Sequence, residues 1–146
     1  MKFRISVFLL CVGMLGCGTR TKAITELNKG REFAKGKDWA TAIACYGDAI
    51  QIDTGFAAAY TYRGRAYDEQ GKYDEALTDH NEAIRLDPND FFAYYYRGIS
   101  HTNKGLHDEA IADLTQAIQL DPNTDAFYAR GVAYAEQGKY DEAVAD

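Results

Sequence analysis

The chain repeats itself with a period of 34 residues. Gly30, Gly64 and Gly98 are 34 residues apart, and Gly131 follows 33 residues later. Twelve residues after each glycine comes an alanine, and the next position holds a large aliphatic residue; these alanines are Ala42, Ala76, Ala110 and Ala143. Agreement at many offsets indicates a solenoid, in which each unit packs mainly on its neighbours.

Each unit has the pattern of two amphipathic helices. Apolar residues in 60–67 and again in 73–86 recur at spacings of three and four residues. Gly71 and Lys72 form the expected turn between the two helices, and Pro88 ends the second one. A helical hairpin cannot bury both of its faces alone, so the hairpins must stack. We therefore predict an all-α fold built of antiparallel helix hairpins.

The spacing of aromatic, glycine, alanine and proline residues resembles the tetratricopeptide repeat (TPR) family. In residues 57–90 the pattern is carried by Tyr60, Gly64, Tyr67, Gly71, Tyr73, Ala76, Ala83 and Pro88. The resemblance implies a right-handed α-solenoid of about 3.5 units with one concave face. The units are 23–56, 57–90, 91–124 and a partial fourth unit at 125–146.

The first residues resemble a secretory leader. Lys2 and Arg4 precede an uncharged run of eleven residues, 5–15, and Met14-Leu15-Gly16-Cys17 resembles the lipobox of bacterial lipoproteins, although Met14 stands where that family usually has Leu. We expect residues 1–16 to be a cleaved signal peptide, Cys17 to carry lipid, and 17–22 to be a short tether. The protein would then lie in the bacterial cell envelope, at the outer membrane or periplasmic face. A soluble secreted or uncleaved form, or a chance apolar start on a cytosolic protein, stays open.

The charge balance and the motifs exclude several functions. The chain has 16 Lys and Arg against 22 Asp and Glu, a net charge of −6, so it lacks the basic surface of a nucleic-acid-binding protein. It contains no phosphate-binding glycine loop, nucleophile elbow or zinc-protease motif. We therefore expect a non-catalytic protein without a cofactor or metal.

Two sets of polar residues recur with the repeat. An Arg precedes the glycine and an acid follows it fifteen residues later, which predicts Arg63–Asp79 and Arg97–Asp113 ion pairs. The alternative is a row of arginines that binds acidic ligands. The histidines stand where other units have aromatic or aliphatic core residues, so we interpret them as structural rather than as a metal site or a proton-sensitive cluster; they are His80, His101 and His107.

The resemblance places the ligand groove on the first helix of each unit. Tyrosine and arginine dominate binding energy at protein interfaces. The candidate partner-binding residues are Arg31, Tyr62, Arg65, Tyr95, Tyr96, Asn103 and Tyr128. We expect an extended or helical segment of another protein, held by aromatic contacts, with Arg31 and Arg65 favouring an acidic residue in it. Some of these tyrosines could instead only pack between helices.

One binding mode of the family is not matched. TPR domains that clamp a C-terminal carboxylate use Lys and Asn in one unit, Asn in the next, and Lys and Arg in the third. The corresponding residues here are Leu27, Arg31, Tyr62, Phe92 and Tyr96, and starting one unit later gives Thr61, Arg65, Tyr96, Asp125 and Ala129. Neither frame provides the clamp.

Two other functions stay open. The last unit lacks half of its second helix, so Phe127, Tyr134 and Tyr140 should be partly exposed and could mediate self-association. The chain could also be the N-terminal targeting module of a longer enzyme.

Overall fold

The computed structural model describes residues 6–146, with side chains from Gly18 onward. Within this range the chain is all-α, with eight helices in consecutive antiparallel hairpins. The helices are α1 (Ser6–Lys35), α2 (Trp39–Ile52), α3 (Ala57–Asp68), α4 (Tyr73–Leu86), α5 (Phe91–Asn103), α6 (His107–Leu120), α7 (Thr124–Glu136) and α8 (Tyr140–Ala145). The predicted fold class and the order of hairpins are confirmed.

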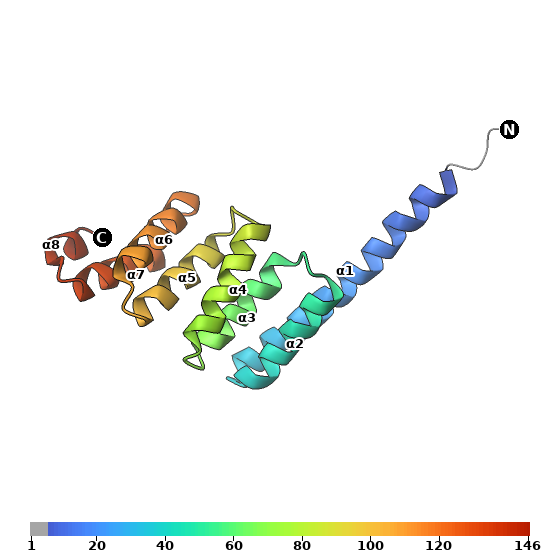
Figure 1. The fold of residues 1–146 in the computed structure, drawn as a ribbon, viewed down its shortest axis with the longest axis horizontal. Helices are drawn as coiled ribbons and strands as arrows, with labels where there is room; N and C mark the ends of the chain where they lie inside the picture. Colours follow the sequence, from blue (N-terminus) through green and yellow to red (C-terminus); the bar gives the residue numbers. More distant parts are fainter. Residues whose placement is uncertain (1–5) are drawn as a thin grey trace.

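The hairpins stack side by side along the long axis of the molecule, from α1–α2 to α7–α8 (Figure 1). Each helix packs on its neighbours in sequence, and the first helices of successive hairpins also contact one another: α1 with α3, α3 with α5, and α5 with α7. In the described residues, the second helices α2, α4 and α6 make no such contacts with each other. The first helices therefore line the inner, concave side of the stack, and the second helices spread along its outside.

Close packing inside a hairpin explains the recurring glycines. A Cβ atom on Gly64 would lie 2.6 Å from Cε1 of His80, and one on Gly98 would lie 2.6 Å from Cγ of Leu114. The large side chain from the second helix thus lies directly against the backbone of the first. At the turn, Gly71 has φ of 72°, a left-handed conformation that glycine adopts without strain.

The predicted ion pairs are present, and each joins the two helices of one hairpin. Arg63 donates from Nε to Oδ2 of Asp79 at 2.7 Å and from Nη2 to Oδ1 at 2.8 Å. Arg97 makes the same bidentate contact with Asp113, from Nε and Nη2 to the two carboxylate oxygens. We call these pairs, together with Arg130–Asp146, the inner ladder. The acid is almost completely buried in the first two, since the side chains of Asp79 and Asp113 are 6% and 8% exposed.

Two of the three histidines take part in packing and in hydrogen bonds to acids, which fits the structural interpretation; the third, His107, has Nδ1 3.7 Å from Oε2 of Glu136, beyond hydrogen-bond distance. His80 is fully buried, with Nε2 3.1 Å from Oδ2 of Asp68, and Asp68 also accepts from Ser100 Oγ at 2.7 Å. His101 Nδ1 lies 2.9 Å from Oδ2 of Asp113. In the described part of the chain, no three potential metal ligands cluster together.

In the N-terminal region, helix α1 is continuous from Ser6, so residues 17–22, expected as a tether, lie within it. The segment contains no proline, which would end the helix, although it contains Gly18. Residues 1–5, and the side chains of residues 6–17 with the predicted lipidation site Cys17, lie outside what the structure describes. Among described residues, no helix has the length and apolar character needed to span a bilayer.

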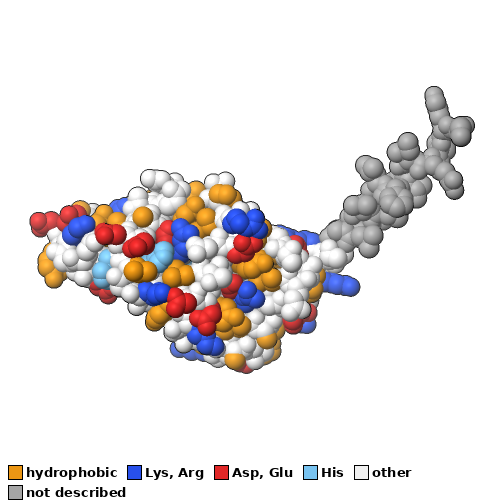
Figure 2. Space-filling model, viewed as in Figure 1, with side chains coloured by type: hydrophobic (Ala, Val, Ile, Leu, Met, Phe, Trp, Pro, Cys, Tyr) orange, Lys and Arg blue, Asp and Glu red, His pale blue; other side chains and the backbone are white. Residues whose placement is uncertain are grey.

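The C-terminal hairpin matches the expectation of partial exposure. Phe127 and Tyr134 are half-buried, and Tyr140 is 69% exposed. Acidic side chains gather at this end of the molecule, over α7 and α8 (Figure 2).

Candidate functional site

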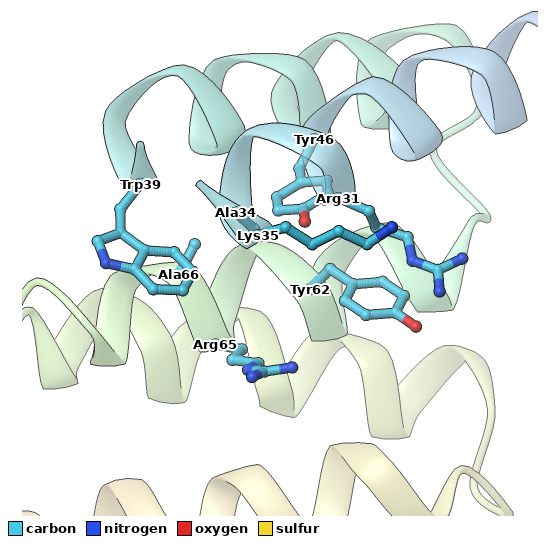
Figure 3. Close-up of a pocket in the computed structure, with 8 residues that line it drawn as sticks. All are labelled: Arg31, Ala34, Lys35, Trp39, Tyr46, Tyr62, Arg65 and Ala66. Atoms are coloured by element: carbon cyan, nitrogen blue, oxygen red, sulfur yellow. The ribbon is translucent and has the colours of Figure 1, made fainter. Parts of the chain in front are cut away.

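The concave side holds a cavity between α1, α2 and α3, which we call the first cavity. It measures about 230 Å³ and is lined by Arg31, Ala34, Lys35, Trp39, Tyr46, Tyr62, Arg65 and Ala66. Figure 3 shows the charged ends of Arg31 and Lys35 lying toward the same side as the hydroxyl of Tyr62, while Trp39 lies on the opposite side next to Ala66. The cavity therefore has a cationic side and an apolar side.

Two arginines of the first cavity lie over aromatic rings. The Cζ atom of Arg31 is 5.4 Å from the centre of the Tyr62 ring, and Cζ of Arg65 is 5.2 Å from the centre of the Tyr96 ring. Among described residues, no carboxylate forms an ion pair with either arginine. Lys35 does pair with Glu32 at 2.8 Å, but both side chains are about 70% exposed, so water screens this pair strongly. The two guanidinium groups keep free donors for a ligand anion.

The charge of the surrounding segment favours an anion here. Residues 18–38 contain six Lys or Arg and three Asp or Glu, whereas residues 107–146 contain two Lys or Arg and nine Asp or Glu. With α2 included, residues 18–56 contain six Lys or Arg and five Asp or Glu, so the end that holds the first cavity is nearly neutral and the other end is strongly acidic. A field of this kind favours a negatively charged ligand at the nearly neutral end over the acidic end.

Tyr46 forms the floor of the first cavity. It is 1% exposed, and its ring stacks on that of Tyr62 with the ring centres 5.9 Å apart. Burial raises the pKa of Tyr46 to about 12. Its hydroxyl therefore stays protonated at neutral pH and is able to donate a hydrogen bond.

A second cavity of about 190 Å³ lies next to the first, toward α5, and the two share Tyr62 and Arg65. The second cavity is lined by Ala58, Thr61, Tyr62, Arg65, Asp90, Phe92 and Tyr96. Asp90 is the N-cap residue of α5. Its Oδ1 accepts from the backbone N–H of Phe92 at 2.9 Å, and its Oδ2 accepts from Thr61 Oγ1 at 2.9 Å. Burial raises the pKa of Tyr96, so this tyrosine also remains neutral.

The structure brings together four of the seven predicted site residues: Arg31, Tyr62, Arg65 and Tyr96 line the two cavities. The other three are not in either lining. Tyr95 is half-buried and stacks on Phe91 with ring centres 5.6 Å apart. Asn103 is exposed at the last position of α5, and Tyr128 is 74% exposed on α7.

The sequence interpretation missed Trp39, Tyr46 and Asp90. Trp39 and Tyr46 lie on α2, a second helix, and the family resemblance pointed only to first helices. Asp90 lies in the connection between two units. A signal existed for Tyr46, because it stands where other units have His80 and Leu114, opposite the recurring glycine.

At one of the clamp positions the structure has a buried apolar side chain. Leu27, at the position of the first clamp lysine, is 7% exposed and packs in the core of the first hairpin. An apolar side chain that is buried there contributes no charge to the groove. Arg31, which lines the first cavity, stands at another clamp position, where those domains have Asn.

Comparisons with known proteins agree with this architecture. Models of the tetratricopeptide repeat match residues 45–78, 91–124 and 125–146, and a TPR repeat model matches residues 64–105. No curated protein sequence matches the chain.

Several solved structures are similar. The second TPR domain of human RPAP3, solved in complex with the HSP70 peptide SGPTIEEVD, is 32% identical with a TM-score of 0.75, and the match covers 79% of this chain and 97% of that one. The Arabidopsis OM64 TPR domain is 28% identical with a TM-score of 0.78, covering 80% and 98%. The first TPR of Spaghetti (RPAP3), bound to the HSP90 peptide SRMEEVD, is 28% identical with a TM-score of 0.73, covering 86% and 95%.

Proposed function

Because the chain belongs to the tetratricopeptide repeat family, we propose that it is a non-catalytic interaction protein that binds a segment of a partner protein in its concave groove. The observation that carries the proposal is the pair of adjoining cavities on the concave side, which share Tyr62 and Arg65. Similar domains have been solved with short peptides bound. Arginine and tyrosine side chains in a concave site favour the binding of such a segment.

The chemistry of the groove favours binding over catalysis. The first cavity offers guanidinium, ammonium and phenol donors together with aromatic walls. Its lining contains no carboxylate, thiol, imidazole or aliphatic hydroxyl that could act as nucleophile or general base near neutral pH. These groups suit the recognition of an acidic side chain next to an apolar surface.

Affinity capture with groove variants tests the proposal. The bait is the chain itself, compared with an Arg31→Gln/Arg65→Gln double variant and with Arg85→Gln, a control on α4 whose ion pair with Glu82 is exposed. All three must have equal helicity by circular dichroism. We expect proteins cross-linked to the wild type and the control to be lost from the double variant. Equal capture by all three baits would refute the groove as the binding site.

We also propose that Cys17 anchors the protein to a membrane of the bacterial envelope through attached lipid. The leader pattern of residues 1–17 supports this step. Two or more acyl chains suffice to hold a soluble domain on a membrane. Incorporation of labelled fatty acid into the wild type and its loss in Cys17→Ser is the expected result; labelling that persists in Cys17→Ser would refute it.

A further inference from the structure

The two cavities adjoin each other but differ in charge. The first cavity contains Arg31, Lys35 and Arg65 and no acidic lining residue. The second contains the carboxylate of Asp90, with Arg65 on the wall that the cavities share. A ligand that lies along the groove therefore meets a cationic site and then a site where one carboxylate, Asp90, lies with the shared Arg65.

The carboxylate of Asp90 is fixed in position. One oxygen accepts from the N–H of Phe92 and the other from the hydroxyl of Thr61, both at 2.9 Å. Because both oxygens are held, the group is not free to turn away from an incoming ligand. A second carboxylate placed in this cavity would face it at short range, and repulsion between desolvated like charges strongly disfavours such a complex.

Apart from Asp90, Thr61 and Arg65, the second cavity is lined by apolar and aromatic side chains. Phe92 is 55% exposed, and its ring stacks on that of Tyr96 with ring centres 6.2 Å apart. Ala58 adds a small apolar surface. An exposed aromatic ring beside such a wall gains by covering its surface with an apolar side chain of a partner.

We propose that the groove selects a partner segment with one Asp or Glu side chain in the first cavity and an apolar side chain in the second, and that Asp90 excludes a second acidic side chain. Asp90 is then a specificity-determining residue, and the groove discriminates against runs of acidic residues. This inference rests on the proposed function. It adds the identity and the order of the two side chains that the groove reads.

Asp90→Asn isolates the charge from the fold. At the N-cap position asparagine stabilises a helix about as well as aspartate, and its side-chain oxygen is still able to accept from the Phe92 N–H. The variant therefore keeps the start of α5 and removes the negative charge, and Nδ2 of asparagine is able to donate to Oγ1 of Thr61 in place of the hydrogen bond that Oδ2 of Asp90 accepts. An unchanged thermal unfolding midpoint verifies this before any binding is measured.

The experiment begins with a random library of 12-residue peptides displayed on phage. It is selected on the wild type, on Asp90→Asn and on the Arg31→Gln/Arg65→Gln double variant. The peptide most enriched on the wild type is then synthesised in two forms, as selected and with Glu at its apolar anchor position, and both affinities are measured by fluorescence anisotropy.

We expect the wild type to enrich peptides with a single acidic residue close to an apolar one. The Glu form should bind the wild type about tenfold more weakly, and Asp90→Asn should recover most of that loss. If the Glu form binds the wild type as well as the parent peptide, or if Asp90→Asn recovers nothing, the inference is wrong.

The double variant separates this inference from the proposed function. Loss of the enriched peptides from the double variant supports the groove, whatever the result with Asp90→Asn. If the double variant enriches the same peptides as the wild type, or if the wild type enriches none, both the groove and the selectivity assigned to it are overturned.

Discussion

Arg63 and Arg65 lie two residues apart on α3 and have opposite environments. Arg63 holds Asp79 with two hydrogen bonds, and its side chain is 24% exposed. Arg65 is exposed over the ring of Tyr96 and, within the described chain, has no carboxylate partner. Two residues along a helix is a rotation of about 200°, so the side chains point to different sides. One arginine stabilises the hairpin, and the other offers its charge to the groove.

The repeat distinguishes the two roles. The position of Arg63 holds an arginine again at Arg97 and Arg130, each with its own acid, because the last three hairpins use the same internal pair. The first hairpin has Lys29 and Cys45 at these positions and lacks the pair. The position of Arg65 is shared with Arg31 but holds Ile99 and Val132 in the later units. In this chain, the arginine with a matching acid fifteen residues after the glycine serves internal packing, and the arginine without such an acid, confined to the first two units, lies at the groove.

The largest effect is expected from breaking the inner ladder at Asp113. This carboxylate accepts from Arg97 Nε at 2.9 Å and lies 2.9 Å from His101 Nδ1. Asp113→Ala leaves a largely buried arginine without its partner and should lower the free energy of unfolding by about 3 kcal/mol. Urea denaturation followed by circular dichroism measures this change. Arg65→Ala is the matched groove variant and should change the free energy of unfolding by less than about 0.5 kcal/mol. Equal losses of stability in Asp113→Ala and Arg65→Ala would contradict the separation of structural from groove residues.

The glycine between the two arginines gives the next largest effect. Gly64→Ala places a Cβ 2.6 Å from Cε1 of the fully buried His80, and the overpacking should cost about 2 kcal/mol. Gly47→Ala is the control, because the nearest atom there is 3.8 Å away, at Nη1 of Arg63, and alanine favours the helix. Thermal unfolding compares the two variants. A loss in Gly47→Ala as large as that in Gly64→Ala would contradict close packing as the cause.

Exchanging the neighbouring arginines for glutamine should separate stability from binding. Arg65→Gln removes one cation of the first cavity and should weaken an acidic peptide selected on the wild type about tenfold, at nearly unchanged stability. Arg63→Gln should lower the free energy of unfolding and leave peptide binding nearly unchanged, because Asp79 loses its partner while the groove keeps its charges. Anisotropy and urea denaturation are measured on both proteins. Parallel losses of binding and stability in Arg65→Gln would show that its role is structural.

The smallest expected effect is the dependence of ladder stability on pH. Burial alone would raise the pKa of Asp113, but hydrogen bonds from His101 and Arg97 outweigh it and lower this pKa. A carboxyl with a depressed folded pKa contributes stability above its unfolded pKa of about 3.9, and this contribution disappears as pH falls through the folded value. The free energy of unfolding should therefore drop below about pH 4. In Asp113→Asn the decrease in the free energy of unfolding between pH 7 and 3 should be smaller by about 1 kcal/mol. Urea denaturation across this pH range measures it. An identical decrease in the wild type and the variant would show that Asp113 does not cause it.

Residues that recur with the repeat could be predicted from the sequence. Only some of the groove residues could. The Arg63–Asp79 and Arg97–Asp113 pairs follow from spacing within one unit, so the sequence sufficed. Tyr95 shows the limit, because its ring packs on Phe91 and lies outside both cavity linings although its position is typical of a groove residue. The tether expected at 17–22 stays a prediction, and the structure has α1 running through these residues.

The sequence by itself determined the hairpins, their order and the internal pairs, because each depends on contacts within one unit and on offsets that repeat. The tertiary structure alone decided which side chains of different units meet. It brought Trp39 and Tyr46 of α2 to the same cavity as Arg65 of α3, and it placed Asp90 against Thr61 in the second cavity. These contacts depend on how one hairpin is rotated onto the next, and that rotation is set by side-chain packing along the whole interface.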